Sequence, residues 1–229
     1  MPPIPPPHML INPSFWIEIF YALIIIITSL IIYFRTTEVA KLSQHKGIKY
    51  FRMTFLFFSI SYLLRGILSL YKILVGRPRF GSLGLVGLPL FLIVYFSTMA
   101  FLYLIYSLIW KEFKHPDKIV IVLHFIAFLI AIFTFVLTRS GFAIFSLIQL
   151  ILLILAIILS VKKHNINKKK RKGLSQYYII YIMFFASWII NNMATFLFTN
   201  VSVLLGGFIY IISILLLIMV MIKIIKITK

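Results

Sequence analysis

The chain has 229 residues, of which 62% are hydrophobic and only 12% are charged, and its mean hydropathy is +1.10. A water-soluble domain cannot bury that much apolar surface, so the composition predicts a chain that folds within a lipid bilayer. The formal net charge is +19 and cysteine is absent, which excludes thiolate nucleophiles, disulfides and cysteine-ligated metal sites.

Seven apolar segments along the chain predict an all-α, multi-pass bundle of transmembrane helices. Each segment is close to the roughly 20 residues that a helix needs to cross about 30 Å of hydrocarbon. The segments do not alternate as the strands of a membrane barrel do. The predicted spans are residues 14–34, 53–75, 88–110, 119–138, 143–161, 177–198 and 206–225. The short turn at residues 138–141 leaves a five-span alternative, in which the fourth and fifth segments do not cross fully.

The distribution of Lys and Arg predicts the orientation of these spans. None precedes the first span, and the six loops in order hold five, three, three, one, seven and none, followed by three in the C-terminal tail, when Lys72 is counted with the second loop and Lys223 with the tail. The high counts fall on alternate connections, which is the positive-inside pattern. We therefore expect a cell-membrane protein with its C-terminus in the cytoplasm and with the proline-rich residues 1–13 as an extracellular lead-in.

The most basic connection, residues 162–176, is predicted to be a cytoplasmic loop on the membrane surface. Lysines near an anionic leaflet contribute about 1 kcal/mol each, so anionic lipid is the expected partner. The loop contains no Phe, Tyr or Trp to stack on bases, and nucleic-acid binding is not expected. The basic residues are Lys162, Lys163, Lys168, Lys169, Lys170, Arg171 and Lys172.

Histidines and carboxylates do not form a recognisable catalytic or metal-binding pattern. Only His124 of the five histidines falls inside a predicted span, and we expect it to be a hydrogen-bonded packing residue rather than a metal ligand. Of the four acids, Glu18 lies in the first span and the other three lie in lysine-rich loops. With no paired acids and no glycine-rich phosphate loop, the chain is not expected to be an enzyme. A lipid-modifying enzyme stays open as the least favoured alternative.

Seven helices with an outside N-terminus is also the topology of the retinal proteins and other seven-helix receptors. A retinal Schiff base needs a lysine inside the last helix, whereas Lys223 lies only at the cytoplasmic end of residues 206–225. The comparison therefore stops at topology, and no cofactor is expected.

Polar residues inside the spans are the remaining candidates for a functional site, because each is costly in lipid. At 1.5 Å per residue, most of them fall in the outer half of the bilayer. Helical spacing puts Arg65 and Lys72 on one face of the second span, and Asn191 and Asn192 on one face of the sixth. The candidate ligand-binding residues are Glu18, Arg65, Lys72, Gln149, Asn191 and Asn192.

Two interpretations of this cluster stay open. In the first it is structural: Glu18 pairs with Arg65 and the asparagines bond neighbouring helices, each bond contributing about 0.6 to 2 kcal/mol. In the second it is a pocket open to the outside, whose excess of cations attracts an anionic or zwitterionic ligand.

Three classes of function remain. The first is a receptor-like or accessory subunit coupled to a membrane or cytoplasmic protein partner. The second is a small-solute transporter or channel, and the third is the lipid-modifying enzyme. Transporters tend to use broken helices at their sites, and no proline lies in the middle of a predicted span, so the first class is favoured. The high isoleucine and lysine content suggests a prokaryotic source.

Overall fold

The computed structural model describes residues 13–43, 46–75, 83–113, 115–136, 141–169, 177–200 and 203–227. These residues form seven α-helices and one short 3-10 turn, so the predicted all-α class is confirmed. The helices are α1 (Pro13–Ser43), α2 (Lys46–Val75), α3 (Leu83–Ile109), α4 (Pro116–Val136), α5 (Gly141–Lys169), α6 (Tyr177–Asn200) and α7 (Val203–Ile227), and the 3-10 turn is η2 (Trp110–Glu112).

Six of the described helices are long and apolar enough to cross a membrane: α1, α2, α3, α4, α5 and α7. Within α6 the apolar stretch of described residues is shorter and covers Ile179–Asn191. Large apolar side chains such as Phe20, Phe125 and Leu215 are more than half exposed on the surface of the bundle, where lipid rather than water is the compatible solvent. The protein is therefore a multi-pass membrane protein.

Several helices extend beyond the predicted spans into charged sequence. Helix α1 continues to Ser43, α2 begins at Lys46, and α5 continues to Lys169. The first half of the predicted basic loop, from Lys162 to Lys169, is thus helical. Hydropathy detects only the apolar part of a helix, while Lys and Arg are good helix formers that continue it into water. Similarly, α3 begins at Leu83 instead of residue 88, so that Pro89 lies in its second turn.

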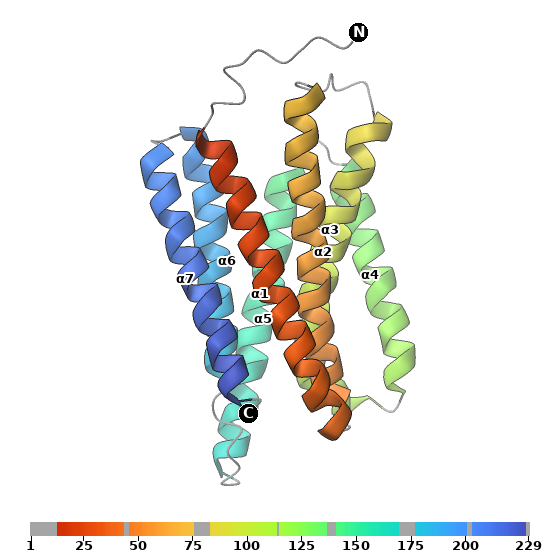
Figure 1. Ribbon diagram of the computed structural model, residues 1–229. Coiled ribbons are helices and arrows are strands. Elements are labelled where there is room, and N and C mark those ends of the chain that lie inside the picture. Colours follow the sequence, from red (N-terminus) through yellow and green to blue (C-terminus); the bar gives the residue numbers. More distant parts are fainter. Residues whose placement is uncertain are drawn as a thin grey trace.

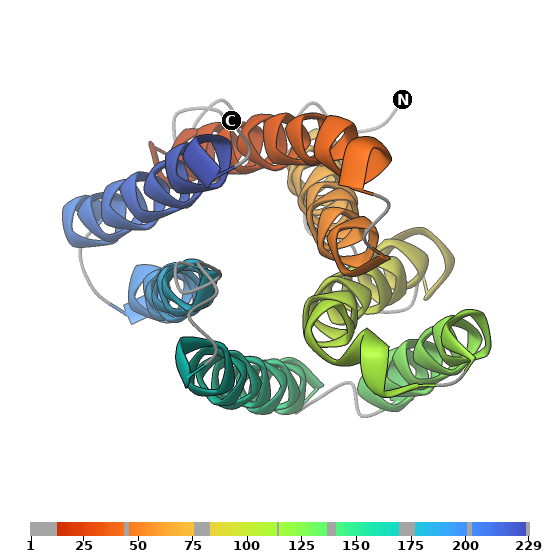
Figure 2. The ribbon, with the colours of Figure 1, turned by 90° about the horizontal axis from the view of Figure 1, so that it is seen from below.

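Consecutive helices run in opposite directions (Figure 1). Their contacts arrange six of the described helices in a ring (Figure 2). Around the ring the order is α1, α2, α3, α5, α6 and α7, and α7 packs back against α1. Helix α4 lies outside the ring, mainly against α3. Its fully buried residues are the small Ala127 and Ala131, which allow close helix approach. Side chains from these six helices therefore fill the interior of the ring.

Most of the described charged side chains lie at one end of the bundle. The C-terminal ends of α1, α3, α5 and α7 and the N-terminal ends of α2, α4 and α6 lie together (Figure 1). The described Lys and Arg side chains there are Arg35, Lys41, Lys46, Lys49, Arg52, Lys111, Lys118, Lys162, Lys163, Lys223 and Lys226. We call this the basic end, and the other end the Arg65 end. The segments with high Lys and Arg counts in the sequence thus share one end of the structure.

Candidate functional site

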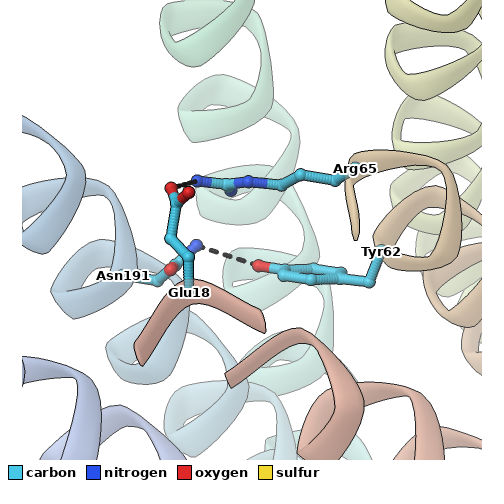
Figure 3. Close-up of polar contacts among 4 residues, drawn as sticks. All are labelled: Glu18, Tyr62, Arg65 and Asn191. Carbon is cyan, nitrogen blue, oxygen red and sulfur yellow. Dashed lines mark hydrogen bonds and ion pairs between the residues drawn. The ribbon is translucent and has the colours of Figure 1, made fainter. Parts of the chain in front are cut away.

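An ion pair between α1 and α2 lies inside the ring, toward the Arg65 end. Arg65 Nη2 donates to Glu18 Oε1 at 3.5 Å, and Figure 3 shows the two side chains extending toward each other. The side chain of Arg65 is 33% exposed and that of Glu18 is 37% exposed. The predicted pairing of Glu18 with Arg65 is confirmed, and the pair is long and partly open to its surroundings.

Tyr62 lies beneath this pair and connects it to α6. Its ring lies one helical turn before Arg65 on α2, with the guanidinium carbon 5.9 Å from the ring centroid, within reach of a cation–π interaction. Asn191 Nδ2 on α6 donates to Tyr62 Oη at 2.9 Å (Figure 3). The predicted bond from Asn191 to another helix is confirmed, although α2 is not adjacent to α6 in the ring. Arg65, Glu18, Tyr62 and Asn191 therefore form one polar cluster from three helices.

Hydrogen bonds between hydroxyl and carbonyl groups join α1, α6 and α7 next to this cluster. Ser187 Oγ donates to the carbonyl of Ser213 at 3.2 Å, and Ser213 Oγ donates to the carbonyl of Ser187 at 3.1 Å. The hydroxyl of Tyr21 lies 2.9 Å from Ser213 Oγ. Sequence reasoning did not select these residues. The available signal was that Ser187 precedes Asn191 by four positions and so shares its helix face.

Other predicted site residues have different surroundings. Gln149 on α5 accepts a hydrogen bond from Trp188 Nε1 at 3.0 Å, and both side chains are buried. Gln149 thus fixes α5 to α6 rather than lying at the ion pair. The side chains of Lys72 and Asn192 lie outside the described residues, as do those of Lys168 and Lys169 and all of residues 170–172.

Two small adjoining cavities open beside the polar cluster. One is lined by Glu18, Arg65 and Ser69, the other by Trp188 and Asn191, and Tyr21 and Tyr62 line both. Each has a volume of about 10 Å³, which is close to the space that one water molecule needs. In this conformation the site accommodates water, and a larger ligand requires the ion pair to separate.

At the basic end, Lys163 is engaged within the bundle. Its ammonium donates to the carbonyl of Leu108 near the C-terminus of α3, where the last carbonyls of a helix lack intrahelical donors. Lys162 is exposed. Of the residues predicted to lie on the membrane surface, these two therefore have different surroundings.

His124 on α4 lies between two tyrosines of α3. Its Nδ1 is 2.6 Å from Tyr95 Oη and its Nε2 is 3.4 Å from Tyr103 Oη. The prediction that His124 is a hydrogen-bonded packing residue is confirmed. These bonds fix the peripheral helix α4 to the ring.

Replacing His124 with leucine is expected to destabilise the protein by about 1 kcal/mol, because interhelical hydrogen bonds in membranes have about that value. The measurement is the thermal unfolding midpoint in detergent. His124→Gln, which retains hydrogen-bonding groups, is the matched control and should unfold closer to the unmodified protein. Equal midpoints for both variants would argue that the tyrosine contacts do not stabilise α4.

Comparison with known proteins finds a relative of similar length. The chain is 31% identical over 206 residues to a protein of Archaeoglobus fulgidus described as an uncharacterized protein, and the match covers 86% of this chain and 87% of that protein. No model of a known protein family matches the chain. No solved structure matches it either.

Proposed function

This chain belongs to the same family as the uncharacterized protein of Archaeoglobus fulgidus, and we propose that it is a receptor-like or accessory subunit of the cell membrane. In this proposal the polar cluster at the Arg65 end binds a small anionic or zwitterionic ligand. The basic end then contacts anionic lipid and a membrane or cytoplasmic protein partner.

The observation that carries the proposal is the long distance and partial exposure of the ion pair between Arg65 and Glu18. The pair is at the limit of hydrogen-bond distance and each side chain is about one third exposed. Because a charged group left alone within a membrane span is costly, the pair separates only when a ligand gives each charge a new partner. A ligand carboxylate or phosphate replaces Glu18 in a charge-assisted bond to the guanidinium. In a zwitterion, the ammonium group then binds the released Glu18.

The described helices favour this class over a transporter with a broken-helix site. Helices α1 to α7 run without interruption between their bounds, and Pro89 lies near the start of α3. Transporters of the broken-helix type instead bind substrate at unwound backbone near the bilayer midplane. A small-solute transporter or channel therefore remains the second candidate, and a lipid-modifying enzyme the third.

Ligand binding is expected to raise the thermal unfolding midpoint of the purified protein. A ligand at 100 times its dissociation constant stabilises the folded state by about 2.7 kcal/mol. The probes are acetate, inorganic phosphate and glycine, titrated at constant ionic strength. At least one of them should raise the midpoint of the unmodified protein and have no such effect on Arg65→Gln.

Arg52→Gln is the matched control for this experiment. Arg52 is a second arginine of α2, and its guanidinium carbon lies 4.8 Å from the ring centroid of Tyr33 near the basic end. Its loss should leave the stabilisation by the probe intact. Absence of any shift with all three probes, or an equal shift in Arg65→Gln, would contradict the proposed site.

The proposal includes the orientation inferred from the basic connections, with the N-terminus outside. Because the chain has no cysteine, a single introduced thiol reports its own location. In intact cells a membrane-impermeant thiol reagent should label Asn200→Cys and leave Lys169→Cys unlabelled. The reverse pattern would show the opposite orientation.

A further inference from the structure

Helix α6 contacts α2 and α3, which lie across the ring from it, at three levels along the helix. Nearest the Arg65 end, Asn191 bonds to Tyr62 of α2. Nearest the basic end, Tyr181 Oη lies 3.1 Å from Ser107 Oγ of α3. Ten residues separate Asn191 from Tyr181, which corresponds to about 15 Å along a helix. Between these two polar contacts, at Phe184, the contact across the ring is entirely aromatic.

A layer of four phenylalanines makes this middle contact. The ring of Phe184 lies 6.0 Å from that of Phe55 and 5.2 Å from that of Phe58, both on α2, and 6.3 Å from that of Phe101 on α3. All four side chains are buried. We call Phe55, Phe58, Phe101 and Phe184 the phenylalanine layer. The layer joins α6 to α2 and α3, which are not adjacent to α6 in the ring.

Polar side chains lie on both sides of the phenylalanine layer. Toward the Arg65 end, the cavity lined by Tyr62, Ser187 and Asn191 also has Phe58 and Phe184 in its lining. Toward the basic end lie Tyr181 and Ser107, together with the ring pair of Tyr50 and Tyr106, whose centroids are 4.5 Å apart. The interior of the ring is therefore polar, then aromatic, then polar again along its axis.

We infer that the phenylalanine layer is a closed hydrophobic gate in a path for water and small polar solutes through the ring. Hydrophobic constrictions in channels exclude water and so block passage until they widen. Buried hydroxyl and amide groups are costly in a membrane interior, yet such groups lie on both sides of the phenylalanine layer, as a path for polar solutes requires. The inference goes beyond the proposed function, since it concerns passage through the bundle and not binding at Arg65. It supports the second candidate, a small-solute channel.

The absence of cysteine allows this gate to be tested with a single thiol. Ser107→Cys places the thiol on the basic-end side of the phenylalanine layer. A membrane-impermeant methanethiosulfonate is added on the Arg65 side, which Asn200→Cys at the end of α6 identifies in intact cells or inside-out vesicles. With Phe184 present, labelling of Ser107→Cys from that side should be slow. Adding Phe184→Ala should raise its rate about tenfold or more, because the apolar barrier is removed.

Phe57→Ala is the matched control. Phe57 is a buried phenylalanine of α2, but it contacts Phe96, Tyr103 and His124 instead of the layer. Its loss should not change the labelling rate of Ser107→Cys from the Arg65 side. Phe58→Ala removes a residue of the phenylalanine layer from α2 and should raise the labelling rate of Ser107→Cys as Phe184→Ala does.

Phe184→Leu keeps most of the apolar volume and should give an intermediate labelling rate. It also serves if the alanine variants do not fold, as judged by elution as a single species in detergent. An unchanged rate in any folded layer variant, or an equal rise in Phe57→Ala, would overturn the inference.

Discussion

Replacing Ser213 with leucine is expected to destabilise the bundle by about 3 kcal/mol. Ser213 is 0% exposed at the contact of α7 with α6 and α1, so the larger side chain has no space without moving a helix. Overpacking of this kind costs about 1 to 3 kcal/mol. The substitution also removes the Ser213 hydroxyl that Tyr21 contacts, and a buried polar group that loses its bond costs about 1 to 3 kcal/mol. The thermal unfolding midpoint in detergent measures the sum.

Ser213→Ala separates the two contributions. It removes the hydroxyl but adds no volume, so we expect a loss of about 1 kcal/mol, from the hydrogen bonds alone. The difference between the leucine and alanine variants then measures how closely α6 and α7 approach. A leucine variant as stable as the alanine variant would show that the helices are not packed tightly at Ser213.

The sequence predicted the charged part of the polar cluster better than its neutral part. A carboxylate and a guanidinium within apolar spans need partners, because leaving either in lipid is costly. That requirement alone predicts the pair of Glu18 and Arg65. Serine hydroxyls carry no such requirement, since they can bond the carbonyls of their own helix, as Ser107 does with Leu104. Nothing in the sequence therefore marks Ser213 as the centre of a three-helix contact.

The arrangement of helices around the ring also lay beyond sequence reasoning. Hydropathy and rise per residue give the depth of a side chain but not the neighbours of its helix. Gln149 and Asn191 are both predicted to lie in the outer half of the bilayer, yet Gln149 bonds to Trp188 and Asn191 bonds to Tyr62. For the same reason the peripheral position of α4 was not predicted, although its apolar residues are typical of a helix that contacts lipid on most sides.

The bond between Asn191 and Tyr62 is expected to appear as a coupling energy of about 1 kcal/mol in a double-mutant cycle. Asn191→Leu should destabilise the protein by about 2 kcal/mol, because it removes the α6 donor to the buried Tyr62 hydroxyl. Tyr62→Phe should cost less in the presence of Asn191→Leu than alone. Unfolding midpoints of the four proteins, measured in one detergent, give the coupling.

Tyr103→Phe combined with Asn191→Leu is the control cycle. Tyr103 lies between α3 and α4 at His124, and substitutions at distant sites without shared partners are usually additive. Additivity in the Asn191 and Tyr62 cycle as well would mean that the direct bond is not formed in the detergent-solubilised protein. Water in the adjoining cavities would then satisfy both groups, and the compartment above the phenylalanine layer would be hydrated even with the gate closed.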